Sequence, residues 1–426
     1  MAQALDRPAI RPAVKRAHII GGGMAGLSAA VALTGAGWRV SVYESGPAAG
    51  GRCRSYFDKG LGCRIDNGNH LLLSGNGAAM AYMRTIGSAA TLGGPGAPVF
   101  PFLELPGGER WTLRPGNGRI PWWIFSRARR VPGTGFADYL RLMALRRAGP
   151  AVTVADALGR AGTLYRRLLE PLAVAALNTP PETGLAHLLA AVVDETLMRG
   201  GAACIPLFPR KGLSESLVDP AVAWLGARDG EVVTSRRIAA LQIEGDGVTA
   251  LEAPDGPLPV AGGEAVVLAV PPWVATDLLP GLVAPDAFEA ILNIHFRVTA
   301  DPGLAGFMGV VGGTAEWIFV KDGIVSVTIS AANRMVDLPS EAIAAQVWAD
   351  VRAALRLRDP MPPVRVVKEK RATFAATAAQ EGRRPHARTK LANLVLAGDW
   401  TATGLPATIE GAIRSGRTAA NLLGAK

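Results

Sequence analysis

The stretch that most constrains the fold of this chain is residues 17–55. It begins with a short apolar run at residues 18–20, which is typical of a buried strand, and continues as a helix-forming segment and a second strand that ends at Glu44. Between the first strand and the helix lie three glycines with the spacing G-x-G-x-x-G: Gly21, Gly23 and Gly26. Strand, turn, helix and strand in this order predict a βαβ unit that binds a dinucleotide.

Each part of this unit has a physical task. Gly21 permits the tight turn, Gly23 lets the backbone approach a pyrophosphate, and Gly26 lets the helix pack closely on the strand. The helix N-terminus offers free N–H groups and the positive end of its dipole to the phosphates. Glu44 is predicted to accept hydrogen bonds from ribose hydroxyls. A carboxylate there also repels a 2′-phosphate, so we do not expect the bound nucleotide to be NADP.

Two consecutive glycines follow Glu44 a few residues later. Gly50 and Gly51 let the chain pass close to a flat or charged group, and Arg52 can bridge phosphate or ribityl oxygens. With Ser55, these residues form a G-G-R-x-x-S extension that resembles the FAD-binding signature of the amine oxidase and phytoene desaturase superfamily. The resemblance implies FAD as the cofactor and separates the chain from plain NAD dehydrogenases.

The end of the chain resembles the second FAD signature of the same superfamily. An apolar strand at residues 394–397 is followed by Gly398 and Asp399, and a helix rich in small residues begins at Ile409 after Thr408. Asp399 can accept a hydrogen bond from a ribityl hydroxyl. The helix N-terminus at Thr408 and Ile409 can aim N–H groups at flavin O2, where negative charge collects in the reduced form.

These signatures predict an α/β fold. A Rossmann-like FAD-binding domain of the GR2 type is interleaved with a substrate domain that combines a mixed sheet with helices. We assign residues 17–75, 206–275 and 388–426 to the FAD-binding domain and residues 76–205 and 276–387 to the substrate domain, which includes a membrane-facing helical part. The resemblance also implies that the backbone near Ile238 holds adenine.

Composition excludes several other classes of protein. Cys53, Cys63 and Cys204 are the chain's three cysteines and form no CxxC pair, which argues against a disulfide framework or a metal site and fits a reducing cytoplasm. Residues 1–16 lack the apolar core of a secretory signal, so we expect a loose tail there. The net charge of +10 favours anionic partners, but we find no nucleic-acid-binding motif.

A cluster of aromatic and basic residues lies in the region 110–150. Trp122, Trp123 and Phe125 are followed by three arginines at positions 127, 129 and 130. Rings at headgroup depth and guanidinium groups on anionic lipid would suit an interfacial contact, peripheral to the inner face of the cell membrane. The alternative is an ordinary helix with a core face and a solvated basic face.

A narrower resemblance covers nearly the whole chain. The stretches that carry it are residues 65–70, 171–180, 293–297, 317–319, 329–332, 368–374 and 398–416. In these stretches the chain is similar to the hydroxysqualene dehydroxylases, the squalene-associated FAD-dependent proteins of bacterial hopanoid pathways. The resemblance implies a reduction of hydroxysqualene to squalene, in which an allylic C–O bond ionises and reduced flavin N5 delivers a hydride to the cation.

The proton donor for the departing water is the least defined residue. His70 is our candidate because its D-x-G-x-H stretch lies beside the flavin in the resembled superfamily, although a surface histidine after a capped turn is an equal alternative. Asp194, Glu195 and His295 are candidates by residue type alone. Asn178 and Arg334 could bind the substrate hydroxyl, but structural roles for both are more probable. The electron donor is predicted to be NAD(P)H or a separate reductase.

Two other functions fit the same signatures. A carotenoid- or phytoene-type desaturase would have the same fold, with hydride moving to the flavin instead of from it. A non-catalytic flavin-binding partner of squalene enzymes would bind FAD without turning over any isoprenoid. An amine oxidase is less favoured, because all five tyrosines fall before the middle of the chain.

Overall fold

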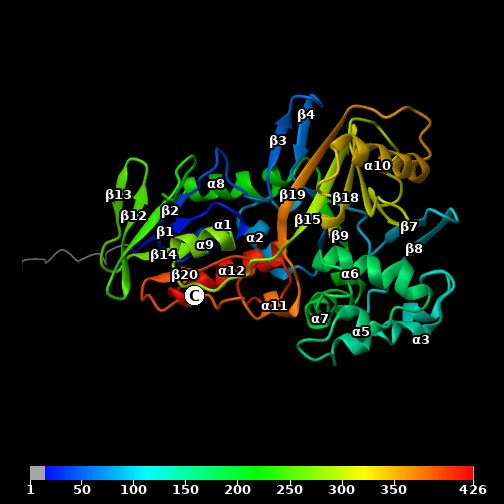
Figure 1. The fold of residues 1–426 in the computed structure, drawn as a ribbon, viewed down its shortest axis with the longest axis horizontal. Helices are drawn as coiled ribbons and strands as arrows, with labels where there is room; N and C mark the ends of the chain where they lie inside the picture. The colour runs from blue at the N-terminus through cyan, green and yellow to red at the C-terminus, as the bar shows by residue number, and fades with distance from the viewer. Residues whose placement is uncertain (1–14, 426) are drawn as a thin grey trace, which may run out of the picture.

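The computed structural model describes residues 15–425 and contains a five-stranded parallel sheet with the order β10-β2-β1-β14-β20 (Figure 1). The strands and the helix that follows β1 are β1 Arg16–Ile20, α1 Met24–Gly35, β2 Arg39–Tyr43, β10 Glu231–Val233, β14 Ala265–Leu268 and β20 Leu394–Leu396. The predicted βαβ unit is therefore present as β1, α1 and β2. The predicted tail lies outside the described residues, apart from Lys15 and Arg16.

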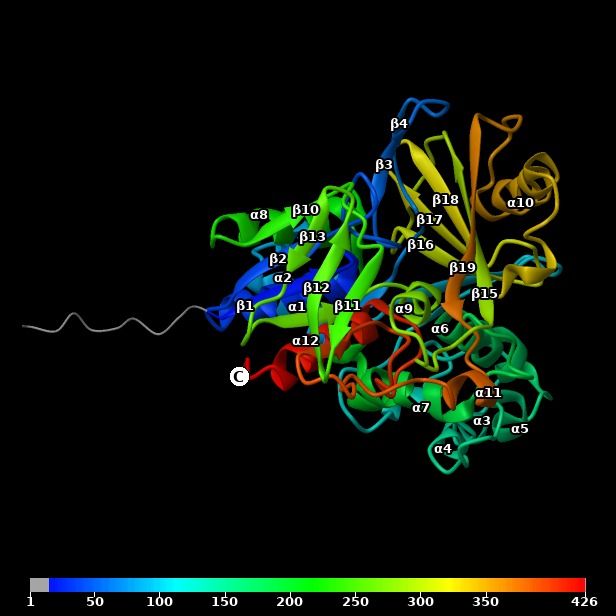
Figure 2. The same cartoon turned by 60° about the vertical axis from the view of Figure 1, so that its left-hand side comes forward.

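Two layers cover this sheet because successive strand residues point to opposite faces. Ile19 and Val267 share a core with α1 and the C-terminal helix α12 (Ile409–Leu422). Ile20 and Leu268 share a separate core with the antiparallel sheet β11-β12-β13. Figure 2 shows this small sheet lying across the parallel one. Its strands are β11 Ala240–Glu244, β12 Gly247–Ala253 and β13 Gly256–Pro259.

Helices α1 and α12 cross at very short range. A Cβ atom added at Gly416 would lie 2.2 Å from the carbonyl oxygen of Ala25 and 2.8 Å from the backbone nitrogen of Ala29. The hydroxyl of Ser28 donates to the carbonyl of Ile413 across the same contact (2.8 Å). Both atoms nearest to Gly416 belong to the backbone, so only glycine lets α12 lie this close to the nucleotide-binding helix.

A second sheet has seven strands in the order β19-β15-β18-β17-β16-β7-β8. Only β16 and β7 pair in parallel among these neighbours. One face packs on helix α10 through Ile294, Val327 and Ile318. The elements are β7 Phe100–Glu104, β8 Glu109–Leu113, β15 Phe288–Phe296, β16 Phe307–Val311, β17 Trp317–Lys321, β18 Ile324–Ile329, α10 Ser340–Leu355 and β19 Val364–Phe374.

A lobe of short helices lies below this sheet in Figure 1 and has its own core. Residues 136–147 contain two short helices, α3 and α4. Between them the backbone bonds tighten to i→i+3, as in Met143 N–H to Leu140 C=O (3.0 Å). The lobe consists of η2 Trp122–Phe125, α3 Phe136–Tyr139, α4 Leu142–Leu145, α5 Val154–Leu158, η3 Tyr165–Leu169, α6 Glu170–Leu177 and α7 Ala186–Glu195.

The remaining elements join the two sheets. Helix α2 packs into the core of α1 and α12, through Ala79 and Met83, although residues 76–205 were assigned to the substrate domain. We therefore propose a domain boundary after residue 93 and keep the other predicted boundaries as proposals. These elements are β3 Ser55–Asp58, β4 Cys63–Asp66, β5 Leu72–Leu73, α2 Gly77–Thr85, β6 Leu92–Gly93, β9 Pro206–Pro209, α8 Asp219–Gly226, α9 Pro272–Leu278 and α11 Ala378–Glu381.

Within residues 15–425, none of the helices combines the length and the apolar character needed to cross a bilayer.

The close crossing of α1 and α12 gives a first prediction. Gly416→Ala should lower stability by roughly 1–3 kcal/mol or more, because the added methyl group forces two backbones apart. Thermal unfolding of the purified protein measures this. Gly35→Ala is the matched control, since a Cβ there meets nothing within 4 Å. An unchanged melting temperature for Gly416→Ala would mean that the helices do not approach this closely.

Candidate functional site

The glycine turn after β1 has the geometry that a pyrophosphate site requires. Gly21 has φ +105°, and a Cβ there would lie 2.6 Å from the carbonyl oxygen of Ala269. A Cβ at Gly26 would lie 2.0 Å from the carbonyl oxygen of Gly21, whereas one at Gly23 would meet nothing within 4 Å. Gly23 is the N-cap of α1 and provides no side-chain cap. The first-turn N–H groups of α1 are thus open to an anionic ligand.

Glu44 lies at the end of β2, next to this turn. Its Oε2 accepts a hydrogen bond from the backbone N–H of Gly22 (2.9 Å) and its Oε1 accepts one from Gly46 (2.7 Å). These bonds fix the carboxylate beside the glycine turn. Oε1 also accepts from the Ser45 hydroxyl (3.4 Å), whereas Oε2 keeps a second lone pair for a ribose hydroxyl, so the residue fits the predicted role.

Arg52 and Asp399 meet in a bidentate ion pair, although they belong to opposite ends of the chain. Arg52 Nη2 lies 2.8 Å from Asp399 Oδ1 and 2.7 Å from Oδ2, and Nη1 donates to the carbonyl of Ala372. Burial disfavours the charged guanidinium, but Asp399 outweighs it and raises the pKa of Arg52. The Gly50–Gly51 step, with φ +110° and +56°, brings Arg52 to this position.

The second signature forms a helix start as predicted. α12 begins at Ile409, and the hydroxyl of Thr408 accepts from Gly411 N–H (3.0 Å). The Glu410 carboxylate accepts hydrogen bonds from the first-turn N–H groups of α2, at Ala78 (2.9 Å) and Ala79 (2.8 Å). α12 is therefore anchored to α2 through Glu410.

Ile238 lies in the connection between β10 and β11. The side chain is 6% exposed and packs in the same core as Ile20 and Tyr43. The predicted role of its backbone at adenine stays a prediction.

Asp66 acts as a structural clamp for the D-x-G-x-H stretch. Its Oδ1 accepts from Ser55 Oγ (2.6 Å) and Leu213 N–H (2.8 Å), and its Oδ2 pairs with Lys321 Nζ (2.7 Å). Burial alone would raise the pKa of Asp66, but Lys321 and the hydrogen bonds lower it. These contacts give Asp66 a structural role at this turn.

Asn293 fixes the next residues of this stretch against the second sheet. Its Oδ1 accepts from Asn69 N–H (3.2 Å) and from Thr328 Oγ1 (2.9 Å). A Cβ at Gly68 would lie 3.0 Å from Asn293 Nδ2. The contacts of Asp66 and those of Asn293 therefore fix the backbone directly before His70.

The His70 ring makes no hydrogen bond with any other residue in the described part of the chain. Burial lowers its pKa to about 4, opposed by Asp66. At neutral pH the imidazole is therefore uncharged, and it can supply a proton only if bound anions raise its pKa. His295 is also uncharged: burial lowers its pKa to about 4, and its Nδ1 lies 2.7 Å from Ser326 Oγ.

Glu316 is the titratable group that sequence reasoning missed. Burial raises its pKa to about 7. Its Oε2 accepts from Ser330 N–H (2.7 Å), and Arg334 Nη2 lies 3.9 Å from Oε1. The only sequence signal was its place directly before Trp317, between two of the stretches similar to hydroxysqualene dehydroxylases. A carboxyl group with this pKa can be protonated at neutral pH.

Asn178 connects the region of Glu316 with Arg52. Asn178 has φ +48°, its Oδ1 accepts from Ala331 N–H (2.7 Å), and its Nδ2 donates to Thr373 Oγ1 (2.9 Å). Ala331 follows Ser330, and Thr373 follows Ala372, whose carbonyl binds Arg52. Nδ2 also donates to the carbonyl of Glu289 (3.3 Å), so both amide N–H groups are engaged, which favours the structural role over binding of a substrate hydroxyl.

The other candidates by residue type do not join this network. Asp194 pairs with Arg146 (3.1 Å), and Glu195 pairs with Arg414 (2.6 Å). The Arg334 side chain is 58% exposed; it lies beside Glu316 and donates to the carbonyl of Ala331 (3.1 Å).

The sheet face that meets the 66–70 stretch changes from polar to aromatic across the strands. Residues in register share a face, so Asn293, Thr328 and Trp317 form one row. The adjoining aromatic residues pack around Phe307, with ring centroids 6.0–6.4 Å from it; they are Phe100, Phe208, Trp317 and Phe319. Phe307 and Phe319 are buried, and Phe100, Phe208 and Trp317 are partly buried against them, so this face forms an apolar cluster next to the 66–70 stretch.

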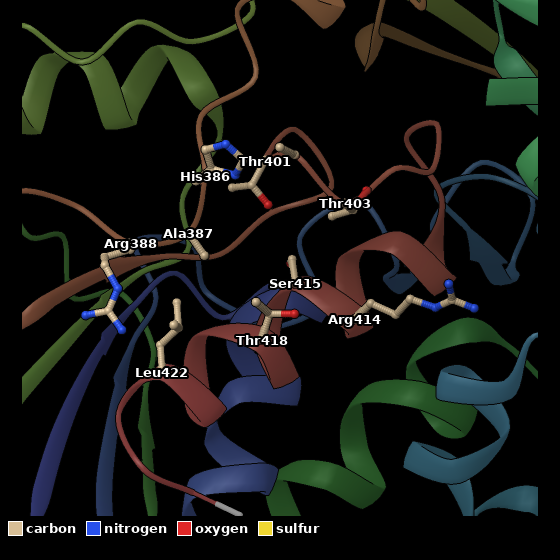
Figure 3. A pocket seen from close by; sticks show the side chains of 10 residues that line it. His386, Ala387, Arg388, Thr401, Thr403, Arg414, Ser415, Thr418 and Leu422 are labelled. Carbon is tan, nitrogen blue, oxygen red and sulfur yellow. The ribbon is translucent and has the colours of Figure 1, made fainter. Parts of the chain in front are cut away.

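A hollow of about 350 Å³ lies between α12 and the segment before it (Figure 3). Its polar groups are largely engaged: Ser415 Oγ accepts from Gly398 N–H (2.8 Å), and Arg414 pairs with Glu195 and Glu410. Figure 3 shows the Arg414 and Arg388 side chains pointing away from each other. We do not include this hollow in the site.

Together, the glycine turn, Glu44, the Arg52–Asp399 pair and α12 define a flavin-dependent oxidoreductase. The family described as "Flavin containing amine oxidoreductase" matches residues 24–301 and 321–423. The fold is shared with a putative protoporphyrinogen oxidase from Exiguobacterium, with a TM-score of 0.68 and 17% identity over 96% of this chain and 98% of that one. The predicted fold class and FAD as the cofactor are confirmed.

Two curated relatives narrow the assignment. A hydroxysqualene dehydroxylase from Rhodopseudomonas palustris is 50% identical over 96% of this chain and 98% of its own. A probable zeta-carotene desaturase from Synechococcus elongatus covers the same shares of both chains but is only 24% identical. The chain belongs to the flavin-containing amine oxidoreductases and, within them, to the hydroxysqualene dehydroxylases.

Glu44 gives the second prediction. Glu44→Ala should weaken FAD binding roughly tenfold or more, because a charged hydrogen bond worth about 1.5–3 kcal/mol is lost. Titration of the apoprotein with FAD, followed by flavin fluorescence, measures the dissociation constant. Glu244→Ala, an exposed acid on β11, is the control. Wild-type affinity in Glu44→Ala would contradict the ribose role.

Proposed function

We propose that this protein reduces hydroxysqualene to squalene. The observation that carries the proposal is an aromatic sheet face directly beside the flavin-binding stretch, in a chain that belongs to the hydroxysqualene dehydroxylases. An apolar wall suits a long isoprenoid, which has few groups for hydrogen bonding. A carotenoid-type desaturase is the weaker alternative because its relative is more distant.

The reaction balances as a two-electron reduction. The substrate hydroxyl takes a proton and leaves as water, and the C–O bond breaks with both electrons on oxygen. Bound in its reduced form, FAD supplies the hydride that the resulting allylic cation accepts. Trp317 is partly exposed on the same face, where an aromatic ring stabilises a cation by cation–π attraction, and the buried Phe319 beside it keeps this part of the face apolar.

The protein group that donates the proton is proposed to be His70 or Glu316. His70 is close to the flavin signature by motif but uncharged at neutral pH in this structure. Glu316 retains its proton to about pH 7, and the Asn178 contacts connect its surroundings to Arg52. The two residues predict different pH profiles, so activity measurements can separate them.

The remaining parts of the proposal concern the electron donor and the place of the reaction. The electron donor is NAD(P)H, bound transiently, or a separate reductase. The substrate is a hydrocarbon held in lipid, so we place the reaction at the inner face of the cell membrane.

An anaerobic experiment gives the third prediction. Reduced enzyme mixed with hydroxysqualene should be reoxidised, with squalene formed in equal amount, as followed by the flavin absorbance and by mass spectrometry. Bleaching of the oxidised enzyme by a saturated isoprenoid precursor would instead indicate a desaturase. Bound FAD that reacts with neither would indicate a non-catalytic partner.

The pH profile gives the fourth prediction. If Glu316 is the donor, its protonated form is required, so the single-turnover rate should fall as the pH rises through about 7. Glu316→Gln should lower the rate roughly 10²-fold or more and remove this alkaline limb. Glu170→Gln is the matched control, because burial also raises the pKa of Glu170, in the helical lobe. An unchanged profile in Glu316→Gln, with loss of activity in His70→Gln, would assign the proton to His70.

A further inference from the structure

The helical lobe carries an outward-facing group of large apolar side chains. We call this group the apolar patch; it consists of Ile120, Trp122, Phe125, Phe136, Leu140 and Met143, which are 36–69% exposed. They come from η2, α3, α4 and the residues next to them. Figures 1 and 2 both place α3 at the end of the molecule away from the parallel sheet. Such a concentration of exposed apolar surface marks an interaction site.

The patch is built on a rigid support. Trp122 points outward, whereas its neighbour Trp123 is 6% exposed and packs edge-on against Tyr139 with ring centroids 5.3 Å apart. The Tyr139 hydroxyl accepts from Val131 N–H (2.9 Å), and Arg130 donates to the carbonyl of Ile124 (3.0 Å). These contacts hold the outward rings in position. The sequence prediction included both tryptophans in the interfacial cluster, but Trp123 belongs to the core.

The outward rings also contact one another. The centroids of Trp122 and Phe125 are 6.1 Å apart, and those of Phe125 and Phe136 are 5.2 Å apart. Residues from two separate elements thus form one continuous aromatic surface.

Positive charge surrounds this surface. Between residues 110 and 155 Asp138 is the only acidic residue, and it accepts from Gly135 N–H in its own turn (2.8 Å). The arginines of this segment are Arg110, Arg114, Arg119, Arg127, Arg129, Arg130, Arg141, Arg146 and Arg147. Across residues 15–425, the recorded ion pairs include Arg146 but none of the three arginines between Phe125 and Val131.

A hollow of about 380 Å³ lies in this basic segment. Arg127, Arg130 and Thr134 line it together with residues 131–133. It lies in the chain between Phe125 and Phe136, the two stacked rings of the patch. A site with two guanidinium groups and no acid suits a phosphate.

Of the occupants for such a surface, an anionic bilayer fits best. A second copy would bring the same arginines against one another, and like charges at close range are repulsive. Bilayers instead take up aromatic and aliphatic side chains at the boundary between headgroups and acyl chains, and present phosphates to the arginines beside them.

We propose that the apolar patch docks this protein on a membrane rich in anionic phospholipid, with Arg127 and Arg130 receiving a headgroup phosphate. The inference deepens the proposed function by naming the surface from which a hydrocarbon substrate is taken up. It rests on that function only for the identity of the substrate, because docking has a readout of its own.

The test is sedimentation of the FAD-bound protein with vesicles of phosphatidylcholine, with and without phosphatidylglycerol. The protein should sediment mainly with the anionic vesicles, and less as salt increases. Trp122→Ser/Phe125→Ser and, separately, Arg127→Glu/Arg130→Glu should each weaken binding roughly tenfold or more. The flavin spectrum should be unchanged in both variants.

Matched controls lie on other surfaces. Phe57→Ser removes an aromatic side chain that is 62% exposed on the β3–β4 hairpin, and Arg352→Glu/Arg358→Glu reverses two exposed arginines at the end of α10. Neither control should change vesicle binding. Equal losses in the controls, or no binding by the parent protein, would overturn the proposal. Dimerisation that Trp122→Ser/Phe125→Ser abolishes, without vesicle binding, would instead assign the patch to a second copy.

Discussion

The bidentate pair between Arg52 and Asp399 joins the two halves of the flavin site. Neither signature can form that site alone, because one follows β2 and the other follows β20 in the same parallel sheet. The close crossing of α1 and α12 at Gly416 brings the two ends of the chain together. Arg52 then extends to the second sheet through the Ala372 carbonyl. The position of the second sheet relative to the flavin site therefore depends on this ion pair and on Gly416.

The parts of the site that sequence predicted well are those with local causes. Gly21, Gly23, Gly26 and Glu44 act within a single βαβ unit, where spacing in the chain fixes spacing in the fold. The start of α12 at Ile409 also has a local cause, since Thr408 caps that helix. The extent of the FAD-binding core was less accurate. α2 joins it because Glu410 binds its N-terminus, and no pattern near residue 77 shows a contact made from the far end of the chain.

The burial of side chains and their pKa values could not be predicted from local spacing in the chain. Glu316 has a raised pKa because pairing of β17 with β18 encloses it near Ser330, and both conditions depend on long-range contacts. The Trp122–Trp123 pair shows a related limit. Neither helical nor strand periodicity applies to a four-residue 3₁₀ turn, so the sequence could not tell which ring packs on Tyr139. Composition suggested an interface, but only the fold separates its outer surface from the core.

The second sheet shows how one element can serve two environments. Along β18, Val325, Val327 and Ile329 face the core shared with α10, whereas Ser326 and Thr328 face the flavin-binding stretch. Strand alternation accounts for this division. Across the strands, the row that begins with Asn293 and Thr328 continues into Trp317 and reaches Phe102 through Gly309. Asn293, at one end of this row, contacts the flavin-binding stretch, and Phe102, at the other end, packs against Trp111 and Trp317. The same row therefore passes from polar to apolar surroundings, and both of its end residues are buried.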